Sequence, residues 1–289
     1  MAEDLRNLDL HMHSTVSDGT DTPEELLVRV RKAGLALFSV TDHDAALAAK
    51  RIRAVAGPDD PAFIPGVEFS CQDEAGKYHI LGYGFDPDNP EFSAVIERGH
   101  SLRMMKAKAR LDFLAETFGF VFPEEEIRKL LSLNNPGKPH IANLMVRLGY
   151  AADKEQAIDD YINKKKFKDA HVRPDEAIRG ILRGGGIPVL AHPLYGDGDQ
   201  LLDGPQLEER LKHLCPYGLE GVESFYSGFS DKQIRIVLDL AAAFGLYVTA
   251  GSDYHGSNKL VRMGDTGLSR AAEYPDGLRR FLRDVRARI

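Results

Sequence analysis

The stretch Asn7-Leu8-Asp9-Leu10-His11-Met12-His13 decides how the rest of the chain is interpreted, because a short apolar run ends there in two histidines. We expect a strand over Asn7–His11. Residues i and i+2 of an extended chain point to the same side. The imidazoles of His11 and His13 are therefore expected to reach one metal ion.

Similar short strands alternate with helical patterns through most of the chain. Further strands are predicted over Phe38–Thr41, Phe63–Phe69, Tyr78–Tyr83, Ile187–Ala191, Leu219–Ser224 and Tyr247–Ala250. Helices are predicted over Pro23–Ala33, Ala45–Ala56, 174–183, 205–214 and 230–245. This alternation favours a parallel sheet with helices outside it, either open or closed into a barrel.

The alternation stops between residues 96 and 171, where the pattern is helical throughout. The expected helices are Arg98–Phe118, Pro123–Leu131, Lys138–Leu148 and Lys154–Lys165. We therefore predict a barrel made of 1–95 and 172–289, with 96–171 as a helical insertion.

Charge is unevenly distributed along the chain. The 289 residues carry a net charge of −7, which argues against binding long nucleic acid by charge alone. The 96–171 segment nevertheless contains 14 Lys and Arg against 11 Asp and Glu. A basic segment beside an acidic body suits a phosphorylated substrate, although a solvated helical surface explains it equally well.

The sequence also bears on the compartment. No apolar run approaches the roughly 18 residues of a membrane span, and the acidic N-terminus lacks the apolar core of a secretory signal. The two cysteines, Cys71 and Cys215, form no CxxC motif. We expect a cytoplasmic protein with no membrane partner and no obligate protein partner.

Nine side chains that can bind metal fall at or near predicted strand ends. They are His11, His13, Asp18, His43, Glu68, His79, His192, Asp253 and His255. Strand ends of an α/β barrel converge, and carboxylates brought together there need cations to offset repulsion and desolvation. Imidazole and carboxylate without thiolate suit Mn²⁺, Fe²⁺ or Zn²⁺. Nine ligands are enough for two or three divalent ions that share a bridging carboxylate.

The motifs that hold these residues resemble those of the PHP (polymerase and histidinol phosphatase) family. They are Asp9-Leu10-His11-Met12-His13, Ser17-Asp18-Gly19, Thr41-Asp42-His43-Asp44, Gly66-Val67-Glu68, His79-Ile80-Leu81-Gly82, Ala191-His192-Pro193 and Ser252-Asp253-Tyr254-His255. The resemblance is to the phosphoesterase branch, which includes 3′,5′-bisphosphonucleotide phosphatases and a 5′→3′ exoribonuclease. It implies a distorted (β/α)₇ TIM-like barrel, the PHP fold, with a small all-helical insertion that covers the active site.

The resemblance also implies which residues share an ion. The first ion would be held by His11, His13, Glu68 and Asp253, the second by Glu68, His79 and His192, and the third by Asp18, His43 and His255. A hydroxide between the first two ions would attack phosphorus, which makes Glu68 catalytic. His192 or His255 would assist proton transfer to the leaving oxygen, and the sequence does not decide between them.

Substrate contacts are expected from basic side chains of the insertion. Our candidates are Arg98, Arg103, Lys138 and His140, because Arg and Lys bind phosphate and Lys138 begins a helix. The alternative is that these are ordinary exposed helix residues. Lys164-Lys165-Lys166 is expected to be a solvated run, and Phe225 and Tyr226 are expected in the core or at its rim rather than beside a base.

The sequence thus predicts a metal-dependent phosphoesterase that hydrolyses phosphomonoesters of small nucleotides, either 3′,5′-bisphosphonucleotides or nucleoside monophosphates. Three alternatives stay open: a histidinol-phosphate phosphatase, a 5′→3′ exonuclease on short RNA, and a non-catalytic module like those attached to replicative polymerases. The complete ligand set disfavours the last.

Glu68→Ala is the first test of the metal assignment. Because Glu68 is expected to bridge two ions, the variant should lose bound metal and turnover together, as measured by elemental analysis and phosphoesterase assay. A variant with full metal content and near-normal activity would contradict the assignment.

Overall fold

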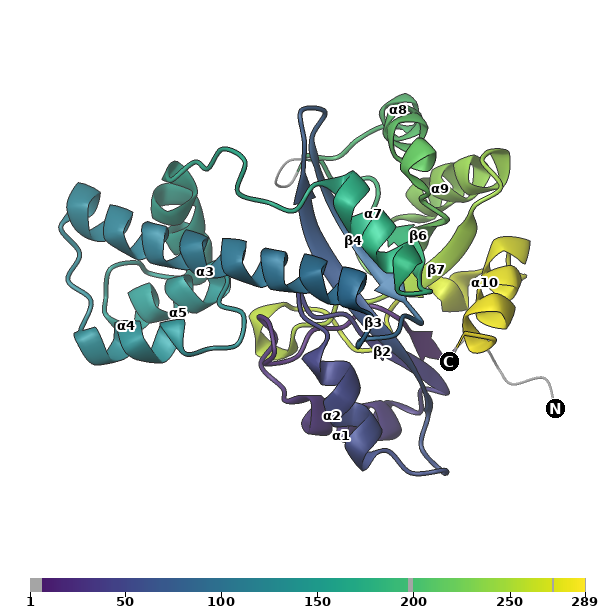
Figure 1. Ribbon diagram of the computed structural model, residues 1–289, viewed down its shortest axis with the longest axis horizontal. Coiled ribbons are helices and arrows are strands. Elements are labelled where there is room, and N and C mark those ends of the chain that lie inside the picture. The colour runs from purple at the N-terminus through teal and green to yellow at the C-terminus, as the bar shows by residue number, and fades with distance from the viewer. Residues whose placement is uncertain (1–6, 197–199, 272, 289) are drawn as a thin grey trace.

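Seven strands form one sheet in the order of the chain, and the sheet closes into a barrel (Figure 1). The computed structural model describes residues 7–196, 200–271 and 273–288. The strands are β1 Leu8–Asp9, β2 Leu37–Val40, β3 Ala62–Gln72, β4 Lys77–Tyr83, β5 Ile187–Leu190, β6 Gly221–Tyr226 and β7 Tyr247–Gly251. The chain just after β1 joins β7, because Leu10 N donates to Ala250 O at 3.0 Å and Asp253 N donates to His11 O at 2.8 Å. The expected barrel-like α/β fold is confirmed.

Strand β4 is the exception to the expected parallel arrangement. It runs antiparallel to both β3 and β5, because only four residues connect it to β3 and a hairpin is the natural result. The beginning of β4 therefore lies at the same end of the barrel as the carboxyl ends of the parallel strands. His79, near the beginning of β4, pairs with Ser70 near the end of β3.

Helices surround the barrel. They are α1 Pro23–Ala33, α2 Leu47–Val55, α7 Pro174–Arg183, α8 Gly204–Leu214, α9 Asp231–Ala243 and α10 Asp276–Arg286. Thr22 caps α1, since its side chain accepts from Glu25 N in a capping box. Helix α10 was not predicted.

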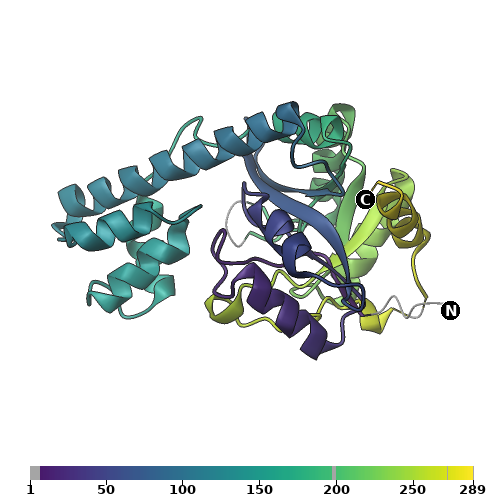
Figure 2. The same ribbon diagram turned by 60° about the horizontal axis from the view of Figure 1, so that its bottom comes forward.

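The longest helix, α3 (Pro90–Phe118), crosses from the barrel to a cluster of outer helices (Figures 1 and 2). It begins eight residues before the expected Arg98, because Asn89 caps it by accepting from Glu91 N and Phe92 N and Pro90 follows the cap. The outer helices are α4 Glu124–Leu131, α5 Lys138–Arg147 and α6 Lys154–Gln156. The helix expected over Lys154–Lys165 is irregular, continuing as a π turn over Ala157–Tyr161 and a 3₁₀ turn over Ile162–Lys164.

The two ends of α3 belong to different hydrophobic clusters. Phe92 and Val95 pack into the barrel core. Ala107, Leu111 and Leu114 pack with α4, α5 and the turns over 157–164 in a separate cluster, which we call the outer helical cluster. One helix thus links two separately packed bodies. Within the described part of the chain, no helix is both long and apolar enough to cross a membrane.

Phe92→Ala tests how α3 is anchored. The Phe92 ring is fully buried and stacks on Phe85 with 4.2 Å between ring centroids. Loss of this side chain should lower the free energy of unfolding by about 3–5 kcal/mol in urea denaturation. Val121→Ala, at a position that is 75% exposed, is the control and should change stability by less than about 0.5 kcal/mol. Equal effects would contradict the anchoring role.

Candidate metal centre

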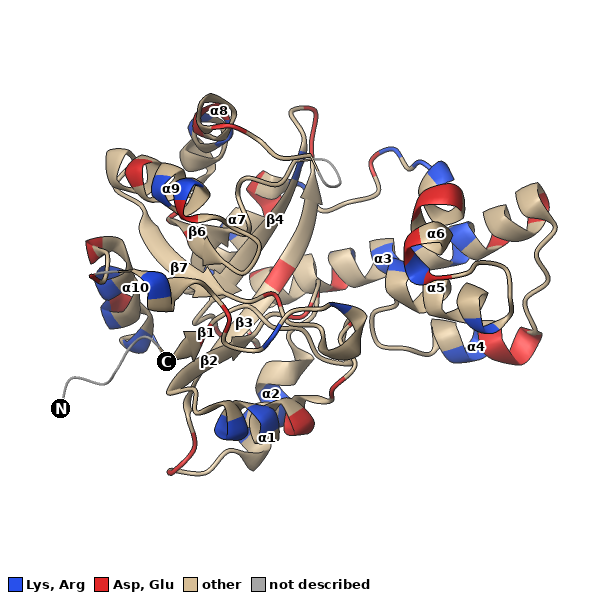
Figure 3. Ribbon diagram, turned by 180° about the vertical axis from the view of Figure 1, so that it is seen from behind, with Lys and Arg blue, Asp and Glu red and all other residues tan. Residues whose placement is uncertain are grey.

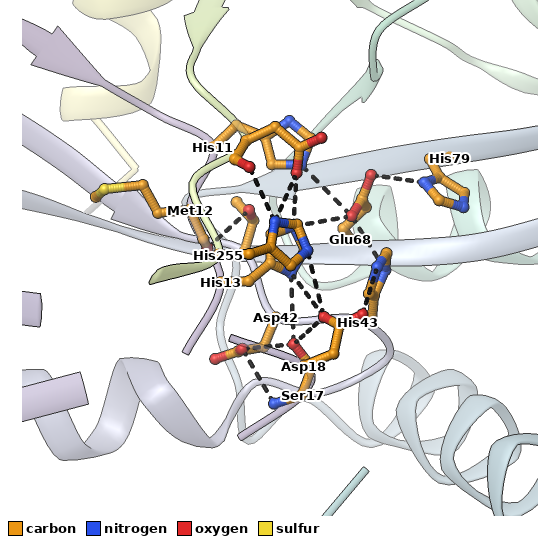
Figure 4. A network of polar contacts seen from close by, with 12 residues as sticks. His11, Met12, His13, Ser17, Asp18, Asp42, His43, Glu68, His79 and His255 are labelled. Carbon is orange, nitrogen blue, oxygen red and sulfur yellow. Dashed lines mark hydrogen bonds and ion pairs between the residues drawn. The ribbon is translucent and has the colours of Figure 1, made fainter. Parts of the chain in front are cut away.

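The carboxylate of Glu68 lies at the middle of the histidine cluster (Figure 4). Strand β3 runs on to Gln72, so Glu68 is inside the strand rather than at its end. Its Oε2 is 3.4 Å from His11 Nε2, 3.2 Å from His13 Nε2 and 3.0 Å from His43 Nδ1. Its Oε1 is 2.9 Å from His79 Nδ1 and 3.3 Å from His192 Nε2. Five imidazoles from four segments of the chain thus face one buried carboxylate.

Two further carboxylates flank this centre. Asp253 Oδ1 lies 3.5 Å from His11 Nε2 and 3.4 Å from His13 Nε2. Asp18 Oδ1 lies 3.4 Å from His255 Nε2, and Asp18 Oδ2 lies 3.9 Å from His43 Nε2.

Three groups have ligand atoms close enough to hold an ion: His11, His13 and Asp253; His43, Glu68 and His79; and His13, Asp18, His43 and His255. These groups include eight of the nine predicted ligands. The ninth, His192, belongs to none of them but lies 3.3 Å from Glu68 Oε1, so all nine lie in one region. The family resemblance assigned each histidine to one ion, whereas in the structure His13 and His43 each belong to two of these groups.

Atoms that lack hydrogen-bond partners support a metal site here. Among the described residues, the buried unpartnered atoms include Nε2 of His11, Nε2 of His13, Nδ1 of His43 and Oε2 of Glu68. Leaving such atoms unsatisfied is costly, and they all face the same small space. Imidazole nitrogen and carboxylate oxygen are suitable donors for divalent ions, so the residues fit the metals that the family resemblance implies.

The charges at this centre also call for cations. Burial by itself would lower the pKa of His13, but the carboxylates of Asp253 and Glu68 that face it outweigh burial and raise that pKa to about 9. Burial likewise opposes ionisation of Glu68, yet the nearby histidines hold the pKa of its carboxyl well below its usual range. The buried carboxylates are thus stable as anions only with positive charge beside them, which protons or metal ions can provide.

Three carboxylates that were assigned no site role position the ligands. Glu223 in β6 accepts from His11 Nδ1 at 3.0 Å and from the backbone N of His192 at 2.8 Å. Asp42 accepts from Ser14 N at 2.8 Å and Ser17 Oγ at 2.7 Å, which fixes the loop before Asp18. Asp9 accepts from Ser252 N at 2.9 Å beside Asp253. The sequence did hold one signal that could have identified Glu223, namely its position near the end of the predicted strand Leu219–Ser224.

Backbone strain is concentrated at or beside the candidate metal ligands. Asp44, His192 and Asp253 are three of the four non-glycine residues with positive φ in the described chain, at 48°, 27° and 59°. Such conformations cost energy and persist where surrounding contacts enforce them, commonly at functional sites. For Asp253 these contacts include Tyr226, whose hydroxyl donates to Oδ2 at 3.0 Å, and Lys259, which pairs with the same oxygen.

A cavity of about 850 Å³ opens beside the metal ligands, between the barrel and the outer helical cluster. Asp18, His43, His79 and His192 line its inner end. Eight basic residues line it as well: Lys77, Arg103, Lys106, Arg110, Lys138, Lys165, Lys166 and Arg210. Asp18 is the one Asp or Glu among the described lining residues. Lys165 and Lys166, which were expected to belong to a solvated run, thus face the cavity.

The four predicted substrate residues are separated by the fold. Arg103 lines the cavity and donates to Asp44 Oδ2 at 2.5 Å and Ser70 Oγ at 2.6 Å. Lys138 lines it and donates to Asn163 Oδ1 at 2.7 Å. His140 instead accepts from Gly137 N at 3.0 Å, at the start of α5. Arg98 pairs with Glu176 at 3.3 Å and lies outside the cavity.

Glu223→Gln tests the role of the supporting carboxylates. The amide keeps the shape but removes the charge that orients and polarises His11, so metal affinity should fall about 10- to 100-fold in calorimetric titration. Glu220→Gln is the control, because Glu220 lies just before β6 and faces Arg288 instead. Unchanged affinity in Glu223→Gln would remove Glu223 from the centre.

Comparison with known proteins agrees with the geometry. The model of the PHP domain family matches residues 9–171. A 5′-3′ exoribonuclease of Haemophilus influenzae is 29% identical, covering 86% of this chain and 90% of the relative. A phosphoribosyl 1,2-cyclic phosphate 1,2-diphosphodiesterase of Eggerthella lenta is 30% identical, covering 86% of this chain and 94% of the relative. A 3′,5′-nucleoside bisphosphate phosphatase of Chromobacterium violaceum is 27% identical, covering 99% of this chain and 98% of the relative.

Solved structures agree as well. An amidohydrolase from Chromobacterium violaceum, with bound sulfate and no metal, superposes with a TM-score of 0.83 at 27% identity and covers 98% of this chain and 96% of its own. A protein from Bifidobacterium adolescentis, named as a metal-dependent phosphoesterase, superposes with a TM-score of 0.77 at 26% identity. The match covers 96% of both chains. The chain therefore belongs to the PHP domain family and is a metal-dependent phosphoesterase.

Proposed function

We propose that this enzyme removes a phosphate monoester from small nucleotides, either 3′,5′-bisphosphonucleotides or nucleoside monophosphates. The observation that carries the proposal is the cavity with eight basic residues, which opens directly onto the metal ligands. Segments 1–95 and 172–289 then form the catalytic barrel, and 96–171 covers its open end.

Bound divalent ions would activate water and neutralise the phosphoryl oxygens. The residues of the three ligand groups would hold these ions, while Arg103 and Lys138 would bind the phosphate from the other side of the cavity. The ion pair with Asp44 fixes the Arg103 guanidinium before substrate arrives, which lowers the entropy cost of binding. The start of α5 beside Lys138 adds a favourable helix dipole.

His192, which lies outside the three groups of ligand atoms, is our candidate for proton transfer to the leaving oxygen. It lines the large cavity, whereas His255 lines only a smaller recess over the ligands. The Nδ1 of His255 is also occupied, because it donates to Asp253 O at 2.9 Å.

The cavity disfavours histidinol phosphate, whose amine is cationic and would meet the basic walls. Short RNA is a second candidate. A neighbouring recess of about 520 Å³ shares Lys77, Tyr78 and Arg210 with the large cavity and would offer room for a second nucleotide, although Asp73, Glu74 and Glu209 also line it. Relatives named exoribonucleases support this alternative.

A phosphoester panel with Mn²⁺ distinguishes these activities. We expect kcat/KM for adenosine 3′,5′-bisphosphate to exceed that for histidinol phosphate by at least about 100-fold, corresponding to about 3 kcal/mol of charge preference. Rates that rise with RNA length would favour the exonuclease. Preference for histidinol phosphate would overturn the proposal.

Arg103→Met should raise KM for the bisphosphate about 10- to 100-fold without loss of metal, because a charge-assisted hydrogen bond contributes about 1.5–3 kcal/mol. Arg98→Met is the matched control from the same helix and should behave like the unmodified enzyme. Equal KM values for the two variants would show that the cavity wall does not bind substrate.

A further inference from the structure

Lys259 is a positive charge placed against a candidate metal ligand. The barrel carries other lysines and arginines on its surrounding helices, for example on α1, α9 and α10 (Figure 3). Lys259 lies instead on the loop after β7, and its Nζ pairs with Asp253 Oδ2. It is the one lysine or arginine among the described residues that line the small recess over the ligands. A cation at this position repels divalent ions, so it opposes the binding that the ligands favour.

The two carboxylate oxygens of Asp253 face different partners. Oδ1 lies 3.4 Å from His13 Nε2 and 3.4 Å from His255 Nδ1. Oδ2 accepts from the Tyr226 hydroxyl at 3.0 Å and pairs with Lys259. Tyr226 is 5% exposed, and its hydroxyl oxygen also accepts from Lys259 Nζ at 3.0 Å. Tyr226 and Lys259 together thus occupy Oδ2, which leaves Oδ1 as the ligand atom.

The other two candidate carboxylate ligands lack such a pair. Both oxygens of Glu68 face histidines, and so do both oxygens of Asp18. Within the part of the chain that the structure describes, neither carboxylate forms an ion pair with a lysine or arginine. The ammonium of Lys259 therefore acts on one ligand of the centre and not on the others.

The loop that carries Lys259 is held in place by its neighbours. Gly256 has a φ of 65°, and a Cβ there would collide with Thr20 Oγ1, so the turn requires glycine. Asn258 Nδ2 donates to Asp18 O at 2.8 Å. These contacts direct the Lys259 side chain back toward the metal centre. Its position is therefore set by the fold and is not that of a freely moving surface lysine.

We propose that Tyr226 and Lys259 are positioning residues that tune the metal centre through Asp253: Tyr226 orients the carboxylate as a one-oxygen ligand, and Lys259 offsets part of its negative charge. The inference rests on the metal centre, with Asp253 among its ligands, and on the proposed phosphatase activity. An ion beside a partly neutralised ligand is bound less tightly but keeps more positive charge to polarise water and phosphoryl oxygens. Lys259 therefore lowers metal affinity and raises turnover.

Lys259→Met tests the effect of the charge. Because the variant removes the repulsion between the ammonium and the ions, its affinity for Mn²⁺ in calorimetric titration should rise at least about 10-fold. The kcat for adenosine 3′,5′-bisphosphate should fall at least about 10-fold, with KM within about 2-fold, because Lys259 acts through the ions and not on the substrate. Lys259→Arg keeps the charge and should stay close to the unmodified enzyme in both measurements.

Tyr226→Phe tests the orientation separately. It removes a neutral hydrogen bond to Asp253, so the affinity for Mn²⁺ should fall about 10-fold. The two variants thus change metal affinity in opposite directions, which a general loss of structure would not do. Lys50→Met is the control, because Lys50 is 56% exposed and pairs with Asp88 at 2.7 Å on α2, outside the recess. It should change neither metal affinity nor turnover.

Weaker metal binding in Lys259→Met would overturn the proposal, since Lys259 would then only support the loop. Unchanged metal affinity with a raised KM would also overturn it, because Lys259 would then bind the substrate directly. Asp253→Asn checks the premise: unchanged affinity for Mn²⁺ would show that Asp253 is no ligand and would overturn the proposal as well. Inactivity on all phosphomonoesters, with the opposite affinity changes retained, would refute the phosphatase assignment and leave Tyr226 and Lys259 assigned to the metal centre.

Discussion

Glu68 is a fully buried carboxylate surrounded by five imidazoles, and the rest of the site depends on this arrangement. The interaction requires a closed barrel, because His11 and His13 follow β1, His79 lies in β4 and His192 follows β5. Backbone hydrogen bonds between the segments after β1 and β7 complete the closure and bring Asp253 to the same place. Glu223, Asp42 and Asp9 then fix the ligand loops. The strained backbone of His192 and Asp253 shows how strongly the surroundings determine this geometry.

The outer helical cluster is attached to the same loops that carry the ligands. Asn135 donates to His43 O, and Asn258 donates to Asp18 O at 2.8 Å. Lys154 of α6 donates to Asn258 Oδ1 at 3.2 Å. The position of the cavity wall is therefore coupled to the position of the ligands. Under the proposed function, the barrel would contribute the metal ligands and α3 would contribute Arg103 to bind the substrate.

The barrel and the nine ligand candidates could both be predicted from the sequence, because the same short motifs show where a strand ends and contain the histidines and carboxylates. It did not predict that β4 runs antiparallel, since His79 stands in an ordinary strand pattern in either direction. It gave no role to Glu223, whose importance depends on His11 and His192, both more than 30 residues away. Arg98 and Arg103 look alike in sequence, and only the packing of α3 shows that Arg98 faces Glu176 and Arg103 faces the cavity.

Anomalous diffraction from crystals grown with Mn²⁺ tests the central claim most directly, because it locates ions independently of activity. The account predicts at least two ions, with Glu68 oxygens and imidazole nitrogens of His11 and His13 at about 2.0–2.2 Å. An enzyme that hydrolyses phosphoesters in the same crystals with no ion bound to Glu68 would contradict it.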